Sequence, residues 1–197
     1  MVVDRIATMN INPEITSLID EIKNDKTHGA SQLAKKAAHV LKVATERSQA
    51  GSVEQFLLEQ KEIGRRLMSS RPVMAPVFNI VSRLLEATLA KATEMALDSI
   101  KQLTISKVDE LVNDSLQAIA RVAGHGCELI ADGDRIMTHS YSSTVMAVMK
   151  EAYNNRINIE VITTRSGPGR TGERLSLIHI SEPTRPLYIS YAVFCLK

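Results

Sequence analysis

The sequence of 197 residues has no tryptophan, three phenylalanines, four tyrosines and only two cysteines. Because aromatic residues are scarce, Ala, Leu, Ile and Met supply the apolar content, and these residues favour helices. Hydrophobic residues still make up 44% of the chain, so it can bury a core and global disorder is not expected. Cys195 lies in a tail that we interpret below as non-native, and Cys127 alone gives no disulfide framework, which is consistent with a reducing compartment.

Charge of one sign and long apolar runs are also lacking. The chain has 24 Lys and Arg against 22 Asp and Glu, which is too balanced for a nucleic-acid-binding surface, so no direct nucleic-acid partner is expected. The first residues, MVVDRIATMNINPE, contain an early acid and no apolar core of a signal peptide. No stretch is long and charge-free enough for a membrane helix. These absences predict a cytoplasmic protein without membrane contact.

The composition shifts abruptly over residues 175–197, LSLIHISEPTRPLYISYAVFCLK. Residues 175–185 back-translate codon by codon onto a transposon-end sequencing adapter, and residues 189–196 onto the outer adapter, with an index-sized gap between them. A genuine Pro-containing tail is the alternative. We interpret residues 175–197 as adapter translation that is not native, and predict a break near Arg174. Excluding this tail removes Cys195 and lowers the net charge from +2 to +1, because it contains Arg185, Lys197 and Glu182.

Residues 1–125 are predicted to form a helical N-terminal domain. Asn12 and Pro13 predict the cap and first residue of one helix, and Ser52 predicts the cap of another. Gly29 marks a turn, and the prolines of RPVMAP mark a second interruption. A long helical region from 77 to 123 follows, with a predicted break near Thr104.

Residues 126–174 change to the pattern of an α/β protein. RIMTHS and INIEVITTR are typical of buried strands, and STVMAVMKEAYNN between them is typical of a helix. A β-α-β unit of this kind predicts parallel strands with a right-handed crossover. The predicted fold class is therefore α/β, with a helical N-terminal domain followed by the truncated start of a doubly wound parallel domain. Two strands alone would leave apolar surface exposed.

Hydroxyl groups gather where the first strand meets the helix. Ser140, Ser142 and Ser143 lie at the helix start, where free N–H groups favour anions, and Arg165 and Arg170 follow the second strand. Together they are candidates for holding a phosphate. Helix capping by Ser142 or Ser143 alone is an equally good interpretation.

Other patterns favour ordinary structure. GHGC, with His125 and Cys127, has no second ligand pair at metal-site spacing, so a turn is predicted there and no metal. RSGPGRTGER lacks a phosphate-loop pattern, and no cofactor is expected. The basic pairs Lys35–Lys36 and Arg65–Arg66 are predicted to be solvated. The three methionines of the C-terminal part are predicted to pack in a core: Met137, Met146 and Met149.

The segments DGDRIMTHSYSSTVMAVMKEA and VITTRSGPGRTGER resemble the family of the alpha, beta and delta regulatory subunits of translation initiation factor 2B. That family also contains ribose-1,5-bisphosphate isomerase and methylthioribose-1-phosphate isomerase. THGAS, residues 27–31, is similar to an Arg-Gly-Ala turn of the isomerases, and RPVMAPVFN, residues 71–79, to their Arg-Pro-Thr segment. The resemblance covers most of residues 10–174.

The resemblance implies a ligand pocket between a helical domain and a Rossmann-like domain. It implies that His28, Gly29, Ala30 and Arg71 contact ligand together with the serines. The isomerases carry a Cys directly after Thr-His and a catalytic Asp further on, which in the family lies beyond Arg174. Here Ser140 occupies the Cys position, and a hydroxyl is far less acidic than a thiol. His28 stands where an Arg would bind phosphate.

Three hypotheses follow from these residues. The first is a regulatory protein that binds a sugar phosphate or nucleotide and forms homo-oligomers or complexes with related subunits, with initiation factor 2 as a further candidate partner. The second is a sugar-phosphate isomerase acting on ribose 1,5-bisphosphate, which Ser140 disfavours. The third is a helical scaffold without a ligand.

Overall fold

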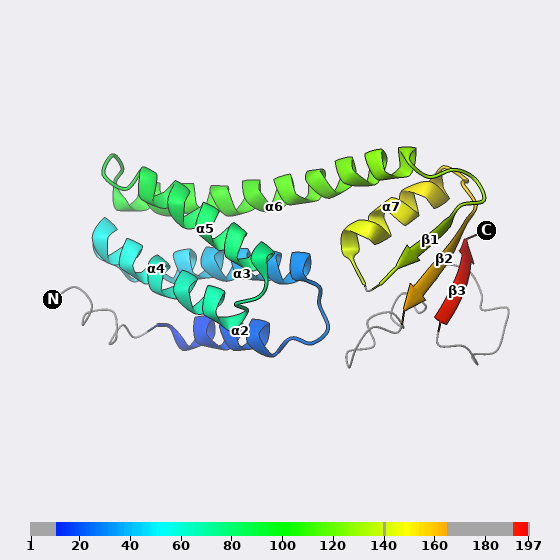
Figure 1. Cartoon of the computed structure of the whole chain (residues 1–197). Helices are drawn as coiled ribbons and strands as arrows, with labels where there is room; N and C mark the ends of the chain where they lie inside the picture. Colours follow the sequence, from blue (N-terminus) through cyan, green and yellow to red (C-terminus); the bar gives the residue numbers. More distant parts are fainter. Residues whose placement is uncertain (1–10, 140, 165–190, 197) are drawn as a thin grey trace. The chain divides into compact units, whose positions relative to one another are not determined.

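The computed structural model describes residues 11–139, 141–164 and 191–196. The chain forms two compact units, Met1–Ser115 and Leu116–Lys197, which are described one at a time (Figure 1). The first is helical, and the second contains a parallel β-α-β arrangement. The predicted fold class is therefore confirmed, whereas the predicted domain boundary at residue 125 and the interpretation of residues 175–197 stay predictions.

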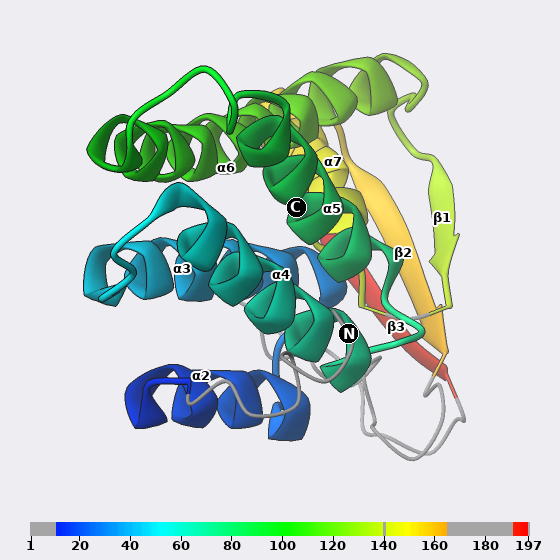
Figure 2. The ribbon, with the colours of Figure 1, turned by 90° about the vertical axis from the view of Figure 1, so that its left-hand side faces the viewer.

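The helical unit contains five helices among its described residues, the last of which continues into the second unit (Figure 2). They are α2 (Pro13–Asn24), α3 (Ala30–Arg47), α4 (Val53–Ser70), α5 (Ala75–Ala90) and α6 (Leu97–Glu128). Two predicted caps are confirmed. Asn12 Oδ1 accepts from the N–H of Glu14 at 2.9 Å, and Ser52 Oγ accepts from the N–H of Gln55 at 3.2 Å. Each cap satisfies a helix-start donor that has no partner inside the helix.

Apolar side chains at helical spacing build one core in this unit. The buried members come from α2 to α6 and include Ile15, Ile22, Leu33, Leu41, Ile63, Leu67, Val81, Leu84 and Val108. α4 and α5 approach closely because Gly64 has no side chain, and a Cβ placed there would lie 2.7 Å from Leu85 Cδ1. The turns that join α2 to α3 and α4 to α5 lie at the ends of helices that pack in this core, and this packing holds the turns in place.

The predicted break near Thr104 is wrong. The interruption lies between α5, which ends at Ala90, and α6, which begins at Leu97. Thr104 is buried inside α6, where its Oγ1 donates to the Ile100 carbonyl at 2.8 Å. Neither Gly nor Pro occurs between residues 77 and 123, so the sequence carried no breaker that could locate the turn.

The second unit places α7 (Ser143–Asn154) between strands β1 (Arg135–Thr138) and β2 (Ile159–Thr164). The strands are parallel, as predicted, with Ile136 opposite Val161. Its buried core, among the residues whose side chains are described, consists of Cys127, Met146, Met149, Ala152, Ile159 and Val161. Met146 and Met149 therefore pack as predicted.

Three features of this unit differ from the sequence-based expectation. Met137 of β1 is 65% exposed and is not in the core. His125 and Cys127 lie in the last turns of α6, not in a turn. A further strand, β3 (Tyr191–Leu196), pairs antiparallel with β2, although no element was predicted there. Among the described residues, no helix is long and apolar enough to cross a membrane.

Candidate functional site

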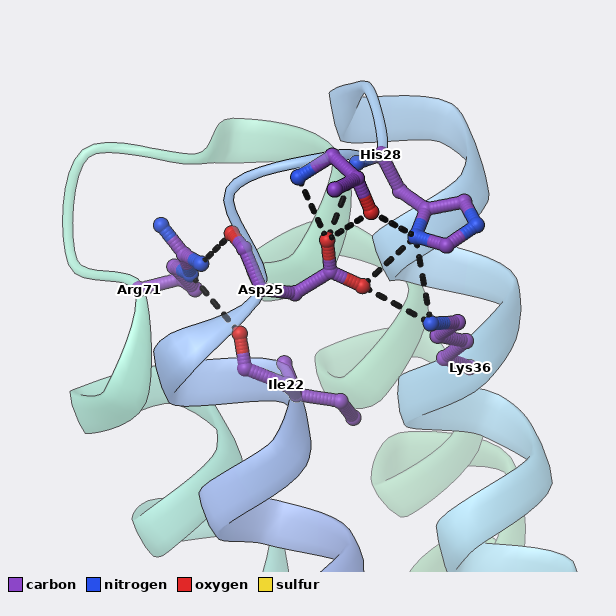
Figure 3. A network of polar contacts seen from close by, with 6 residues as sticks. Ile22, Asp25, His28, Lys36 and Arg71 are labelled. Carbon is purple, nitrogen blue, oxygen red and sulfur yellow. Dashed lines mark hydrogen bonds and ion pairs between the residues drawn. The ribbon is translucent and has the colours of Figure 1, made fainter.

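The turn between α2 and α3 is organised by the side chain of Asp25, of which only 7% is exposed (Figure 3). Its Oδ1 accepts from the N–H of Thr27 at 2.8 Å, from the Thr27 hydroxyl at 2.9 Å and from the N–H of His28 at 2.9 Å. Its Oδ2 contacts Lys36 Nζ at 2.8 Å and His28 Nδ1 at 2.6 Å. The Asp25 carboxylate thus contacts backbone N–H groups, a hydroxyl and two basic side chains.

The electrostatic balance at Asp25 favours the ionised carboxylate. Burial raises the pKa of Asp25, but hydrogen bonds from Lys36, from the backbone of Thr27 and His28 and from the Thr27 hydroxyl lower it by more. The pKa of this carboxyl consequently lies well below its usual range. At neutral pH the cluster holds a fixed negative charge beside the basic side chains.

Arg71, directly after α4, binds the other end of the same turn. Its Nε donates to the Ile22 carbonyl at 2.9 Å, and its Nη2 donates to the Asp25 carbonyl. These carbonyls lie at the end of α2, where the Ile22 carbonyl also accepts from the N–H of the C-cap residue Asp25 at 3.4 Å. Arg71 therefore caps α2, and the structure brings it and His28 to the same turn, 43 positions apart in the sequence.

Gly29 and Ala30 form the start of α3 beside this cluster. Gly29 is the N-cap, with φ −77° and ψ 167°, and no side-chain hydrogen bond caps the helix. The first turn of α3 also contains no acidic residue. Helix starts of this kind attract anions because their N–H groups point outward.

The predicted serine cluster belongs to the second unit. Ser142 is the N-cap of α7, and its Oγ accepts from the N–H of Val145 at 3.4 Å. Ser143 is the first residue of the helix. Capping is thus the contact that the structure gives Ser142. Ser140, Arg165 and Arg170 lie outside the described residues, as does the whole Gly-rich segment of residues 165–174.

Sequence analysis missed two members of the Asp25 cluster. Lys36 is exposed, as predicted, but the sequence did not indicate that its ammonium binds Asp25, nor that Asp25 has a role. The spacing Asp-x-Thr-His is a local signal for a side chain that accepts from the following N–H groups. Lys36 carried no such signal, because it meets Asp25 across eleven residues and a change of direction.

The second basic pair is also bound to a carboxylate. Arg65 Nε donates to Glu62 Oε2 at 2.7 Å, and Arg66 Nε donates to Glu62 Oε1 at 2.8 Å. The Glu62 side chain is 3% exposed. Within the described ranges, no group of three or more potential ligands is arranged to hold a metal ion.

These elements define the chain as an α/β protein with a helical unit followed by a parallel β-α-β unit. The helical unit bears the cationic turn between α2 and α3. The sequence pattern of the Initiation factor 2 subunit family matches residues 26–186. The chain belongs to that family.

Individual relatives agree with this assignment. The chain is 30% identical over 166 residues to a ribose 1,5-bisphosphate isomerase of Thermococcus kodakarensis, covering 84% of this chain and 52% of that protein. The structure resembles translation initiation factor eIF-2B of Pyrococcus horikoshii with a TM-score of 0.71 and 26% identity, over 84% of this chain and 55% of that one. A tetrameric eIF2B-beta2-delta2 complex from C. thermophilum has the same fold, with a TM-score of 0.64 and 23% identity, over 74% and 49%. The chain spans about half the length of these relatives.

Proposed function

We propose that this chain is part of a regulatory, non-catalytic member of its family that binds a phosphorylated small ligand and partner subunits in the cytoplasm. The observation that carries the proposal is the turn where His28, Lys36 and Arg71 surround Asp25 beside the start of α3, which no side chain caps. Basic side chains and outward N–H groups are the chemistry that recognises a phosphate.

Ser140 supports a binding role over a catalytic one. The resemblance places it where the isomerases carry a Cys. Moving a proton between two sugar carbons needs an acid and a base of suitable strength, and a serine hydroxyl lacks that acidity unless a base lies beside it. The proposed ligand is a sugar phosphate or a nucleotide.

The partners proposed are further copies of this chain or related subunits, with initiation factor 2 as an additional candidate. The similarity to a tetrameric complex of related subunits supports this proposal. Light scattering on the protein at several concentrations tests it, and a monomer at every concentration would contradict the oligomer.

An isomerase is the second candidate, and the Thermococcus kodakarensis relative favours it. In that case the Asp25 cluster would hold a phosphate group of ribose 1,5-bisphosphate, and the reaction would need a carboxylate that the resemblance places beyond Arg174.

Calorimetry with ribose 1,5-bisphosphate and with AMP, beside a turnover assay, tests the two candidates. The protein to be tested is the one translated from the genomic locus through and beyond Arg174. The regulatory proposal predicts that this protein binds ribose 1,5-bisphosphate and does not convert it to ribulose 1,5-bisphosphate. Ser140→Cys in that protein tests whether a lost thiol is the cause, and Ser143→Cys is the matched control, because it adds a thiol at the same strand–helix junction. Turnover by the unaltered protein would refute the regulatory proposal, and absence of binding would refute both.

A further inference from the structure

A cavity lies at the loop that joins α7 to β2. Its volume is about 390 Å³, and sites for small ligands commonly measure roughly 300–1,000 Å³. The lining residues are Tyr153, Asn154, Arg156, Ile157 and Asn158. All five belong to the second unit, whereas the Asp25 cluster belongs to the first. The cavity is therefore a feature distinct from the turn between α2 and α3.

Hydrogen bonds hold the loop around this cavity in place. Asp132 Oδ1 accepts from the backbone N–H of Asn158 at 2.7 Å and from its Nδ2 at 2.9 Å. The Asn158 carbonyl accepts in turn from the N–H of Gly133 at 2.8 Å. Ile157 packs against the core of the second unit. The wall of the cavity is thus formed before any ligand arrives, and a preformed site loses less entropy on binding.

Arg156 occupies a backbone position that glycine usually takes. Its φ is 61°. Its N–H donates to the Tyr153 carbonyl at 2.9 Å, and the N–H of Ile157 donates to the Ala152 carbonyl at 3.0 Å. This pair of bonds around a left-handed residue is a common helix end, and an arginine is strained there relative to glycine. Among the described residues, no hydrogen bond or ion pair of the Arg156 side chain offsets this strain.

Three side chains of the cavity have polar or aromatic groups that no described residue binds. The Arg156 guanidinium is a planar cation, which binds a carboxylate or a phosphate through paired N–H groups. The Tyr153 side chain is 53% exposed, so its ring offers a flat apolar face. The Asn154 amide supplies a donor and an acceptor. Together these groups match a ligand that has a charged end and a flat, polar-edged body.

We propose that this cavity binds a small organic anion that joins a planar ring to a phosphate or a carboxylate group. Arg156 binds the anionic group, Tyr153 packs against the ring, and Asn154 forms hydrogen bonds with its polar edge. The strain at Arg156 is then the cost of placing a cation at the mouth of a preformed cavity. This site goes beyond the proposed function, which concerns the first unit.

NMR titration of the full chain with four probes tests the proposal. AMP joins a ring to a phosphate and benzoate joins a ring to a carboxylate, whereas inorganic phosphate has no ring and adenosine has no charge. AMP or benzoate should shift the backbone amide signals of residues 153–158, and the tighter of the two identifies the anionic group. Inorganic phosphate and adenosine should each bind about tenfold more weakly than that probe, because each lacks one of the two contacts.

Variants at two cavity positions measure the contacts separately. Arg156→Gly should lower the affinity for the tighter probe about tenfold, and it should fold well because glycine relieves the backbone strain. Arg156→Lys should lose less, since it keeps the charge without the planar donors. Tyr153→Leu should lose about threefold or more, since it keeps apolar contact without the ring. Arg121→Gln is the matched control, because it removes one exposed cation of the second unit outside the cavity, and it should bind normally.

Several results would overturn the inference. One is the absence of shifts at residues 153–158 with every probe. Another is an equal loss of affinity in Arg156→Gly and Arg121→Gln, which would indicate unspecific attraction of anions. A third is inorganic phosphate that binds as tightly as AMP and benzoate, because the ring would then contribute nothing.

The same titration separates this inference from the proposed function. AMP that shifts residues 25–30 and leaves residues 153–158 unchanged, with benzoate also without effect there, would overturn the inference while the proposed function stands. Shifts at residues 153–158 that depend on Arg156, in a protein that does not bind ribose 1,5-bisphosphate, would support the inference while the proposed function fails.

Discussion

Single side chains at helix ends fix the local geometry of this molecule. Asn12 and Ser52 were predictable because a cap acts on the next few residues of its own chain. The Arg71 contact was not predictable, because it joins the end of α4 to carbonyls of the α2 end. Sequence pattern predicts contacts within one turn of chain, whereas contacts across the fold depend on how the helices pack.

Arg71→Ala should destabilise the chain by about 1–3 kcal/mol without any ligand present, because it leaves two carbonyl groups at the end of α2 without their charged donor. Arg71→Lys should retain only part of the stability that Arg71→Ala loses, since an ammonium lacks the planar pair of donors. Urea unfolding measures both. Arg83→Ala, at an exposed position of α5, is the control and should change stability by less than about 0.5 kcal/mol. Equal stability of Arg71→Ala and the unaltered chain would contradict the capping role.

Glu62 should make the helical unit sensitive to acid. Hydrogen bonds from Arg65 lower its pKa, burial opposes them, and hydrogen bonds from Arg66 add to the lowering, so that the pKa is about 2. A depressed pKa in the folded state stabilises the protein above the ordinary pKa of Glu, and this stabilisation is lost as pH falls from about 4.5 toward 2.

Glu62→Gln should therefore reduce the free energy of unfolding by on the order of 2 kcal/mol at pH 7, and by progressively less as pH falls. Chemical denaturation of the variant and the unaltered chain at several pH values measures the difference. Glu46→Gln, at an exposed position of α3, should show almost no difference at any pH. A Glu62 effect that stays constant down to pH 2 would exclude the ion pairs as its cause.

At the scale of elements, helix type was predictable and some helix ends were not. Periodicity located α3 and α7, because a buried face repeats along the whole element. The end of α6 escaped prediction because Gly124 and Gly126, which usually weaken helices, lie inside its last turns. Tertiary contact explains one of them. A Cβ at Gly126 would lie 2.7 Å from Val148 Cγ2 and 2.9 Å from Val148 Cγ1.

These two glycines make a matched pair of variants in one helix. Gly126→Ala should destabilise the second unit by about 1–3 kcal/mol, because both methyl groups of Val148 obstruct the new Cβ and a β-branched side chain has few rotamers. Gly124→Ala has no neighbour within 4 Å and should stabilise by up to about 1 kcal/mol. Thermal and urea unfolding measure both shifts. Shifts of the same sign would show that helix propensity, and not packing against α7, decides position 126.

Each unit has its own core among the described residues, and Tyr141 packs against the core of the second unit. All four tyrosines lie after residue 115, and the chain has no tryptophan. Among the described residues, the core of the second unit has six buried residues, fewer than that of the helical unit. Less buried apolar area gives less stability, so the second unit should unfold first.

Tyrosine fluorescence should therefore report a urea midpoint below that of far-UV circular dichroism, to which the helices of the first unit contribute most. Gly126→Ala should lower the tyrosine midpoint further and leave the dichroism of the first unit unchanged. Coincident midpoints in both experiments would show that the two units unfold as one.

The antiparallel pairing of β3 with β2 has a consequence for the identity of the chain's end. The hydrogen bonds of strand pairing are made by peptide groups, which every sequence possesses, so the edge of β2 can pair with more than one sequence. The family match extends to residue 186, whereas the adapter interpretation begins at Leu175. If the genomic sequence differs over residues 191–196, the edge of β2 would offer the same row of amides and carbonyls to a strand encoded there, without any change in β2.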